Sequence, residues 1–191
     1  MSDETIGKPL PWAEQFEASN SLDRIPVETR DVFKAFLEQR EGIMDYYGIF
    51  PANRVDTERI GVGNTAKEDL VDLVATSRVR NTGLATRKID SWNDPEKETL
   101  RQMSVSDLVE LLKTEAVRFY DILSGLQPND LATPIPLPYG KSSTVMGQIN
   151  GALLHEVGHV HQAIKFGDQF GQYTPDEKPL PRPRAVAKNW G

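Results

Sequence analysis

Apolar side chains recur at helical spacing in four separate segments, and this pattern constrains the fold more than any other feature of the sequence. The segments run from residue 27 to about 48, from 65 to about 89, from 104 to about 124, and from 144 to 167 or 171. Apolar residues three and four positions apart are typical of amphipathic helices. No alternation of apolar and polar residues predicts a strand. We therefore expect an all-α fold, a four-helix bundle with long connections.

Proline-rich segments flank this helical region on both sides. Residues 1–26 predict an extended N-terminal arm, with Trp12 as the side chain that would anchor it. Residues 172–191 carry four prolines among basic side chains and predict an extended C-terminal strap. Residues 27–171 would then form a single bundle domain.

Composition narrows the classes of function. The 191 residues contain 22 Lys and Arg against 28 Asp and Glu, so the net charge of −6 does not favour nucleic-acid binding. The chain has no cysteine, which excludes thiolate metal sites and leaves His, Asp and Glu as candidate ligands. No apolar run reaches the length of a membrane span and no signal peptide is recognisable, so we expect a cytoplasmic protein that does not bind membranes.

Charged side chains on two of the apolar stripes point to buried polar contacts. Arg40 lies on the stripe of the first segment, where it either extends its charged end to solvent or pairs with an inward carboxylate. Glu115 lies on the stripe of the third segment, and an inward carboxylate needs a partner. We expect it to bond to Arg40 or Arg78; the alternative is a role as metal ligand.

All three histidines fall within seven residues of the fourth segment. His155 and His159 are four positions apart, so on a helix one cation can reach both imidazoles. The residues from His155 to His159 read H-E-V-G-H, which matches the H-E-x-x-H pattern of zinc peptidases with Glu156 as the catalytic base. That chemistry also needs a third ligand and a strand edge to hold a peptide, and neither is evident in the sequence.

The same helix resembles the last helix of the DinB-like (YfiT-like) family of metal-binding four-helix bundles. The family pattern is a histidine, a second histidine four positions later, and a glutamine three positions after that; here these are His155, His159 and Gln162. The order of elements over residues 27–175 also agrees. The resemblance implies one divalent metal and transferase or isomerase chemistry on a small molecule, in some members with a thiol cofactor.

The third metal ligand departs from the family pattern. The family usually places a histidine in the second helix, where this chain has none. The matching position is close to Asp72, and a site with two histidines and one carboxylate would suit zinc, nickel or iron(II). The helical wheel turns Asp72 away from the apolar stripe, so Glu115 and water stay open as alternatives.

Two further interpretations remain open at this stage. In one, the chain is a metal-free bundle that binds a ligand or a protein partner, a homodimer included. In the other, the metal site exists and Glu156 is a buried hydrogen-bonding group beside it, since Glu156 lies nearer the apolar stripe than the histidines do. His161 points elsewhere and is expected to be structural.

Overall fold

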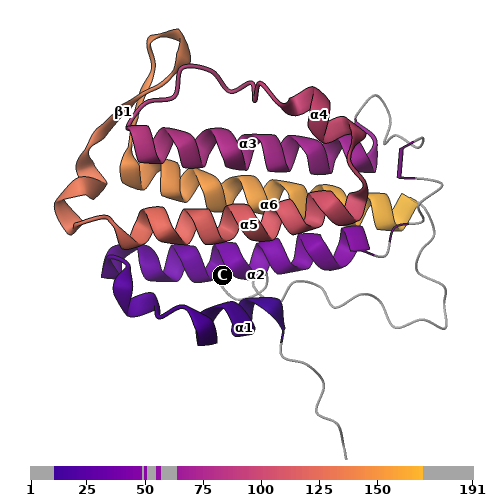
Figure 1. The fold of residues 1–191 in the computed structure, drawn as a ribbon, viewed down its shortest axis with the longest axis horizontal. Helices are drawn as coiled ribbons and strands as arrows, with labels where there is room; N and C mark the ends of the chain where they lie inside the picture. The colour runs from indigo at the N-terminus through magenta and orange to yellow at the C-terminus, as the bar shows by residue number, and fades with distance from the viewer. Residues whose placement is uncertain (1–10, 49, 51–54, 57–63, 170–191) are drawn as a thin grey trace, which may run out of the picture.

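The structure, a computed structural model, describes residues 11–48, 50, 55–56 and 64–169, with side chains to residue 163. Four long helices lie side by side along most of its length (Figure 1): α2 (Val27–Gly48), α3 (Ala66–Thr86), α5 (Val105–Ser124) and α6 (Val145–Gln169). The predicted all-α four-helix bundle is confirmed. Within the described residues no helix has the length and apolar character needed to cross a membrane.

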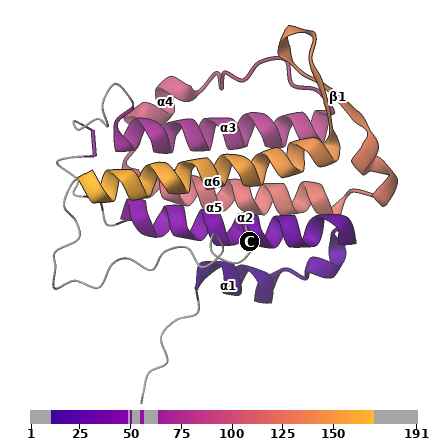
Figure 2. The ribbon, with the colours of Figure 1, turned by 180° about the vertical axis from the view of Figure 1, so that it is seen from behind.

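The four helices enclose a common core. Helix α2 packs against α5 and α6, and α3 packs against the same two helices. The colours of Figure 1 show that α2 and α6 run in one direction and that α3 and α5 run in the other. A long connection returns the chain from the end of α3 to the start of α5, and the view from behind shows it on the outer side of α3 (Figure 2).

Two apolar clusters make up the core, and a polar layer separates them. The layer consists of side chains from the middle of each long helix: Arg40, Ser77, Glu115 and Glu156. On every helix these residues fall between members of the first cluster, such as Leu73 and Val160, and members of the second, such as Phe33 and Ala152. The polar residues seen on the stripes in the sequence are therefore a continuous buried layer.

Capping residues explain where two of the long helices begin. The Thr65 hydroxyl accepts a hydrogen bond from the amide of Glu68, and the Glu68 carboxylate accepts one from the amide of Thr65, which is the predicted capping box. Ser104 caps α5 in the same way. Helix α3 ends at Thr86, three residues before the predicted end, because Arg87 adopts a left-handed conformation (φ 60°, ψ 30°).

The N-terminal segment is not an extended arm over its described part. Residues Trp12–Ser19 form helix α1, followed by the 3₁₀ turn Leu22–Arg24. Trp12 and Phe16 lie one helical turn apart, and the ring of Phe16 contacts those of Phe33 and Tyr120. This aromatic packing, which a proline count does not reveal, stabilises a helix against the bundle.

The connections hold more regular structure than the sequence predicts. Helix α4 (Lys97–Gln102) lies in the expected connection between the second and third long helices, and two strands, β1 (Pro134–Pro136) and β2 (Ser142–Thr144), pair as a short antiparallel hairpin. The turns Pro128–Ala132 and Pro138–Gly140 flank the first strand. The predicted strap 172–191 lies outside the described residues.

Candidate functional site

The two paired histidines meet at their Nε2 atoms. His155 and His159 lie one turn apart on α6, and their Nε2 atoms are 3.3 Å from each other. Their ring centroids are 4.5 Å apart with the planes inclined at 60°. His159 is buried, at 8% exposure, and His155 is half-buried. The two imidazoles therefore present adjacent ring nitrogens at a protected position, as the sequence predicts.

A carboxylate and a phenol hold His159 from behind. Nδ1 of His159 lies 2.9 Å from Oδ2 of Asp69 on α3, and the hydroxyl of Tyr47 on α2 donates to the same oxygen at 2.6 Å. Burial raises the pKa of Tyr47 well above its ordinary value, and the charge of Asp69 adds to this effect. Tyr47 thus stays a donor to Asp69, and a His159 ring that carries its proton on Nδ1 donates it to the same carboxylate. That arrangement leaves the Nε2 lone pair of His159 free to accept.

His155 is held in its neutral form by its surroundings. Burial lowers its pKa to about 3, and the electrostatic effects of the neighbouring His159 ring and of the charges on Arg80 and Arg40 lower it further, in that order. Its Nδ1 is buried and has no hydrogen-bond partner among the described residues. A neutral imidazole keeps a lone pair for a cation or a proton donor.

Asp72, the carboxylate matched to the family's third ligand, does not join the histidines. It accepts a hydrogen bond from Nδ2 of Asn64 at 3.0 Å and forms an ion pair with Lys97. The reason is helical geometry. Asp69 lies three positions earlier on α3 and occupies the buried side, whereas Asp72 is on the flank that faces Lys97 of α4.

Glu156 is a structural residue of the polar layer. It is 1% exposed, its Oε2 accepts a hydrogen bond from Nε of Arg40 at 3.0 Å, and its Oε1 accepts another from Nη2 of Arg40. Arg40 also donates to the hydroxyl of Ser77 and to the carbonyl of Leu112, both at 2.9 Å. Arg40 therefore pairs with an inward carboxylate, one of the two predicted alternatives. Because both oxygens of Glu156 bind a guanidinium, the structure offers no geometry for the predicted catalytic base.

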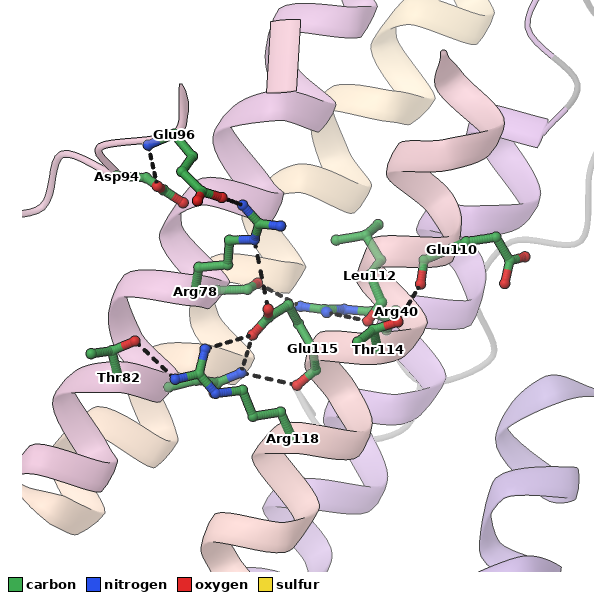
Figure 3. Close-up of polar contacts among 12 residues, drawn as sticks. Arg40, Arg78, Thr82, Asp94, Glu96, Glu110, Leu112, Thr114, Glu115 and Arg118 are labelled. Atoms are coloured by element: carbon green, nitrogen blue, oxygen red, sulfur yellow. Dashed lines mark hydrogen bonds and ion pairs between the residues drawn. The ribbon is translucent and has the colours of Figure 1, made fainter. Parts of the chain in front are cut away.

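Glu115 has other partners than the histidines (Figure 3). Its Oε2 accepts a hydrogen bond from Nδ2 of Asn81 at 2.8 Å, and it forms ion pairs at 3.7 Å with Arg78 and with Arg118. The predicted contact with Arg78 is thus present, and the alternative contact with Arg40 is not. Glu115 is satisfied without a metal.

The described residues contain no cluster of three or more His, Cys, Asp or Glu side chains arranged around a common point. Two imidazole nitrogens converge, and Asp69 supports one of them from behind. His161 is exposed, and its Nδ1 lies 2.8 Å from the carbonyl oxygen of Val157 on the same helix.

The sequence reasoning missed Asp69 and Tyr47. Asp69 stands four positions before Leu73, so a helical wheel centred on the fully buried pair Leu70 and Leu73 would have placed it inward. Tyr47 closes the apolar stripe of α2, where its ring reads as core. Only the position of α3 beside α2 and α6 shows that its hydroxyl meets a carboxylate.

Comparisons with known proteins identify the fold. No family profile matches the sequence, and no curated protein matches it. A solved structure does match: that of a DinB-like protein, YjoA from Bacillus subtilis, with a TM-score of 0.60 and 18% identity over 81% of this chain and 99% of that one. Identity at this level reports on the fold and leaves the activity open. The chain has the DinB-like helical bundle fold.

Proposed function

We propose that this bundle binds one divalent metal ion through Nε2 of His155 and Nε2 of His159. The observation that carries the proposal is the distance of 3.3 Å between these atoms. Two nitrogens bound to one tetrahedral zinc at 2.0–2.1 Å lie roughly 3.3–3.4 Å apart. A hydrogen bond between the two rings is the competing explanation, but 3.3 Å is long beside the roughly 2.7–3.2 Å that N–H donors in proteins keep from oxygen acceptors.

The surroundings of His159 support the same assignment. Metal-binding histidines usually donate their second ring N–H to a carboxylate, which fixes the tautomer and makes the free nitrogen more basic. Asp69 supplies that carboxylate at 2.9 Å, and Tyr47 holds it in place from α2. Two helices other than α6 are thus engaged in orienting one imidazole.

A site with two protein ligands leaves positions open to other molecules. Catalytic sites in which a metal acts as Lewis acid keep at least one such position. A divalent ion bound here would supply Lewis-acid chemistry by lowering the pKa of a thiol or water that reaches it. The protein's own part is to keep His155 neutral, to orient His159 and to shield one side of the site with packed helices.

By its likeness to DinB-like bundles, we infer a metal-dependent transferase or isomerase that acts on a small molecule in the cytoplasm. Zinc, nickel and iron(II) all accept imidazole ligands. A thiol cofactor and a homodimeric assembly are part of the same proposal. The peptidase alternative lacks support because Glu156 pairs with Arg40 in the core.

Elemental analysis of protein purified under metal-replete conditions tests the proposal. We expect about one equivalent of metal in the wild type and its loss in His155→Ala and in His159→Ala. His161→Ala is the matched control, since His161 lies on the same helix but is exposed. Wild-type protein without metal would leave a metal-free bundle as the better account, and variants that keep the metal would place it away from these histidines.

A further inference from the structure

Arg80 differs from the other arginines of the bundle interior in having no acceptor. Arg40 donates to Glu156, Ser77 and Leu112. Figure 3 shows two more arginines of the long helices that are paired: the half-buried Arg78 contacts Glu96 at 2.8 Å, and the exposed Arg118 donates to the hydroxyl of Thr82 at 3.0 Å. For Arg80, no residue in the described part of the chain accepts a hydrogen bond or forms an ion pair, and its Nε is buried without a partner.

The guanidinium of Arg80 is flanked by an aromatic ring and by α6. Its central carbon lies 5.5 Å from the ring centroid of Trp92, within the range of a cation–π contact. On the other side is Gly151, at whose position an added Cβ would be 3.8 Å from Nη2 and 3.9 Å from Nε. Gly151 precedes His155 by one helical turn, so the charge of Arg80 lies beside the proposed metal site on the same face of α6.

The charge of Arg80 is only partly compensated within the protein. Burial lowers its pKa to about 10; the negative charge of Glu156 acts in the opposite direction, but Glu156 is already bonded to Arg40. A half-buried guanidinium whose buried Nε has no acceptor is costly to maintain unless a partner reaches it. Planar guanidinium groups bind carboxylate and phosphate oxygens especially well.

We propose that Arg80 binds the oxyanion group, carboxylate or phosphate, of a small-molecule ligand where its guanidinium lies between Trp92 and α6. Trp92 would cover the flat face of the guanidinium, and Gly151 would leave room along α6. The claim that this ligand is the substrate of the metal centre rests on the proposed function, because the anion would be held one helical turn from His155. The claim that an anion binds at this position depends on Arg80 alone.

The fluorescence of Trp92, which lies against Arg80, can be used to measure anion binding. The chain has three tryptophans, so W12F with W190F leaves Trp92 as the single emitter. Sodium acetate and sodium phosphate are titrated into this protein at constant ionic strength, with and without metal. We expect a saturable change, and the anion that binds more tightly identifies the class of ligand group.

Three variants separate the outcomes. Arg80→Met should weaken anion binding roughly tenfold to a hundredfold, the effect of losing charge-assisted hydrogen bonds. Arg80→Lys should weaken it less, since the charge remains but the two-pronged geometry is lost. Arg101→Gln is the matched control, because Arg101 is exposed and paired with Glu98.

Thermal unfolding shows whether a variant that no longer binds anions is still folded. Replacing a charge that has no acceptor with an apolar side chain of similar length is expected to leave the melting temperature unchanged or raise it. Equal anion binding by wild type and Arg80→Met, or no saturable response in the wild type, would overturn the inference. Metal bound without an anion would overturn this inference alone, whereas an anion bound without metal would overturn the proposed function alone.

Discussion

Asp69 on α3 and His159 on α6 are joined by a contact of 2.9 Å that crosses 90 residues of sequence. It ties the orientation of one imidazole to the packing of two helices. Tyr47 extends the connection to α2. The proposed metal site therefore depends on the bundle being assembled, and its affinity should respond to changes that do not touch a ligand.

Asp69→Asn should lower metal affinity without removing a ligand. The amide keeps the shape of the side chain but loses the charge that makes His159 more basic, and losses of roughly 10–100-fold are typical for such partners. Competition with a chromophoric chelator measures the effect. Asp72→Asn is the control on the same helix, because Asp72 contacts Asn64 and Lys97. Equal affinities for the two variants would argue against the role given to Asp69.

Glu156→Gln should act on stability more than on any reaction. It removes the charge that compensates Arg40, which is fully buried, and breaking a buried pair from one side costs about 3–5 kcal/mol. Urea denaturation measures the free energy of unfolding. The double variant Arg40→Met with Glu156→Leu should be less destabilised than the single one. A stable Glu156→Gln protein that has lost only peptidase activity would instead support the zinc-peptidase interpretation.

Stability of the metal-free protein should fall as the pH drops below about 6.5. The pKa of His155 is lowered to about 3 in the fold, so between these values the unfolded chain binds a proton that the native state does not. The slope for one such group is at most about 1.4 kcal/mol per pH unit. Glu41 and Asp45 have pKa values raised by burial and act in the opposite sense. The test therefore compares wild type with His155→Gln, whose free energy of unfolding should lack the pH-dependent contribution of His155. An identical pH dependence of that free energy in the two proteins would contradict the assignment.

Two glycines in helices should respond oppositely to alanine. At Gly83 an added Cβ would lie 2.2 Å from Cγ1 of the buried Ile89, so Gly83→Ala should destabilise the fold, by about 1–3 kcal/mol for overpacking of this kind. At Gly158 nothing lies within 4 Å, and Gly158→Ala should stabilise α6 by about 0.5–1 kcal/mol. Calorimetry on both variants checks the pair, and two shifts of the same sign would be the contrary result.

Helix periodicity was sufficient for the fold, because each long helix buries one apolar stripe that is interrupted only at the polar layer. The caps at Thr65 and Ser104 were also readable, since both depend on residues three positions apart. Helix α1 was missed because its stability comes from the contact of Phe16 with rings of other helices. Contacts of that kind are set by tertiary packing and leave no local signal.

In the candidate site, too, local contacts could be predicted from the sequence and contacts between helices could not. The proximity of His155 and His159 follows from one helical turn, so the sequence was enough to predict it. The carboxylate behind His159 depends on which side of α3 faces α6, and an error of three residues exchanged Asp72 for Asp69. Glu156 illustrates the limit of a short motif, because its neighbours match a peptidase pattern while its side chain serves the core.

Anomalous diffraction from crystals of the metal-loaded protein, recorded at the absorption edge of the bound metal, tests the central claim most directly. The account predicts a single peak about 2 Å from Nε2 of both His155 and His159, with Asp69 still bonded to Nδ1 of His159. A peak at another place, or metal-replete crystals with no peak at these histidines, would contradict it.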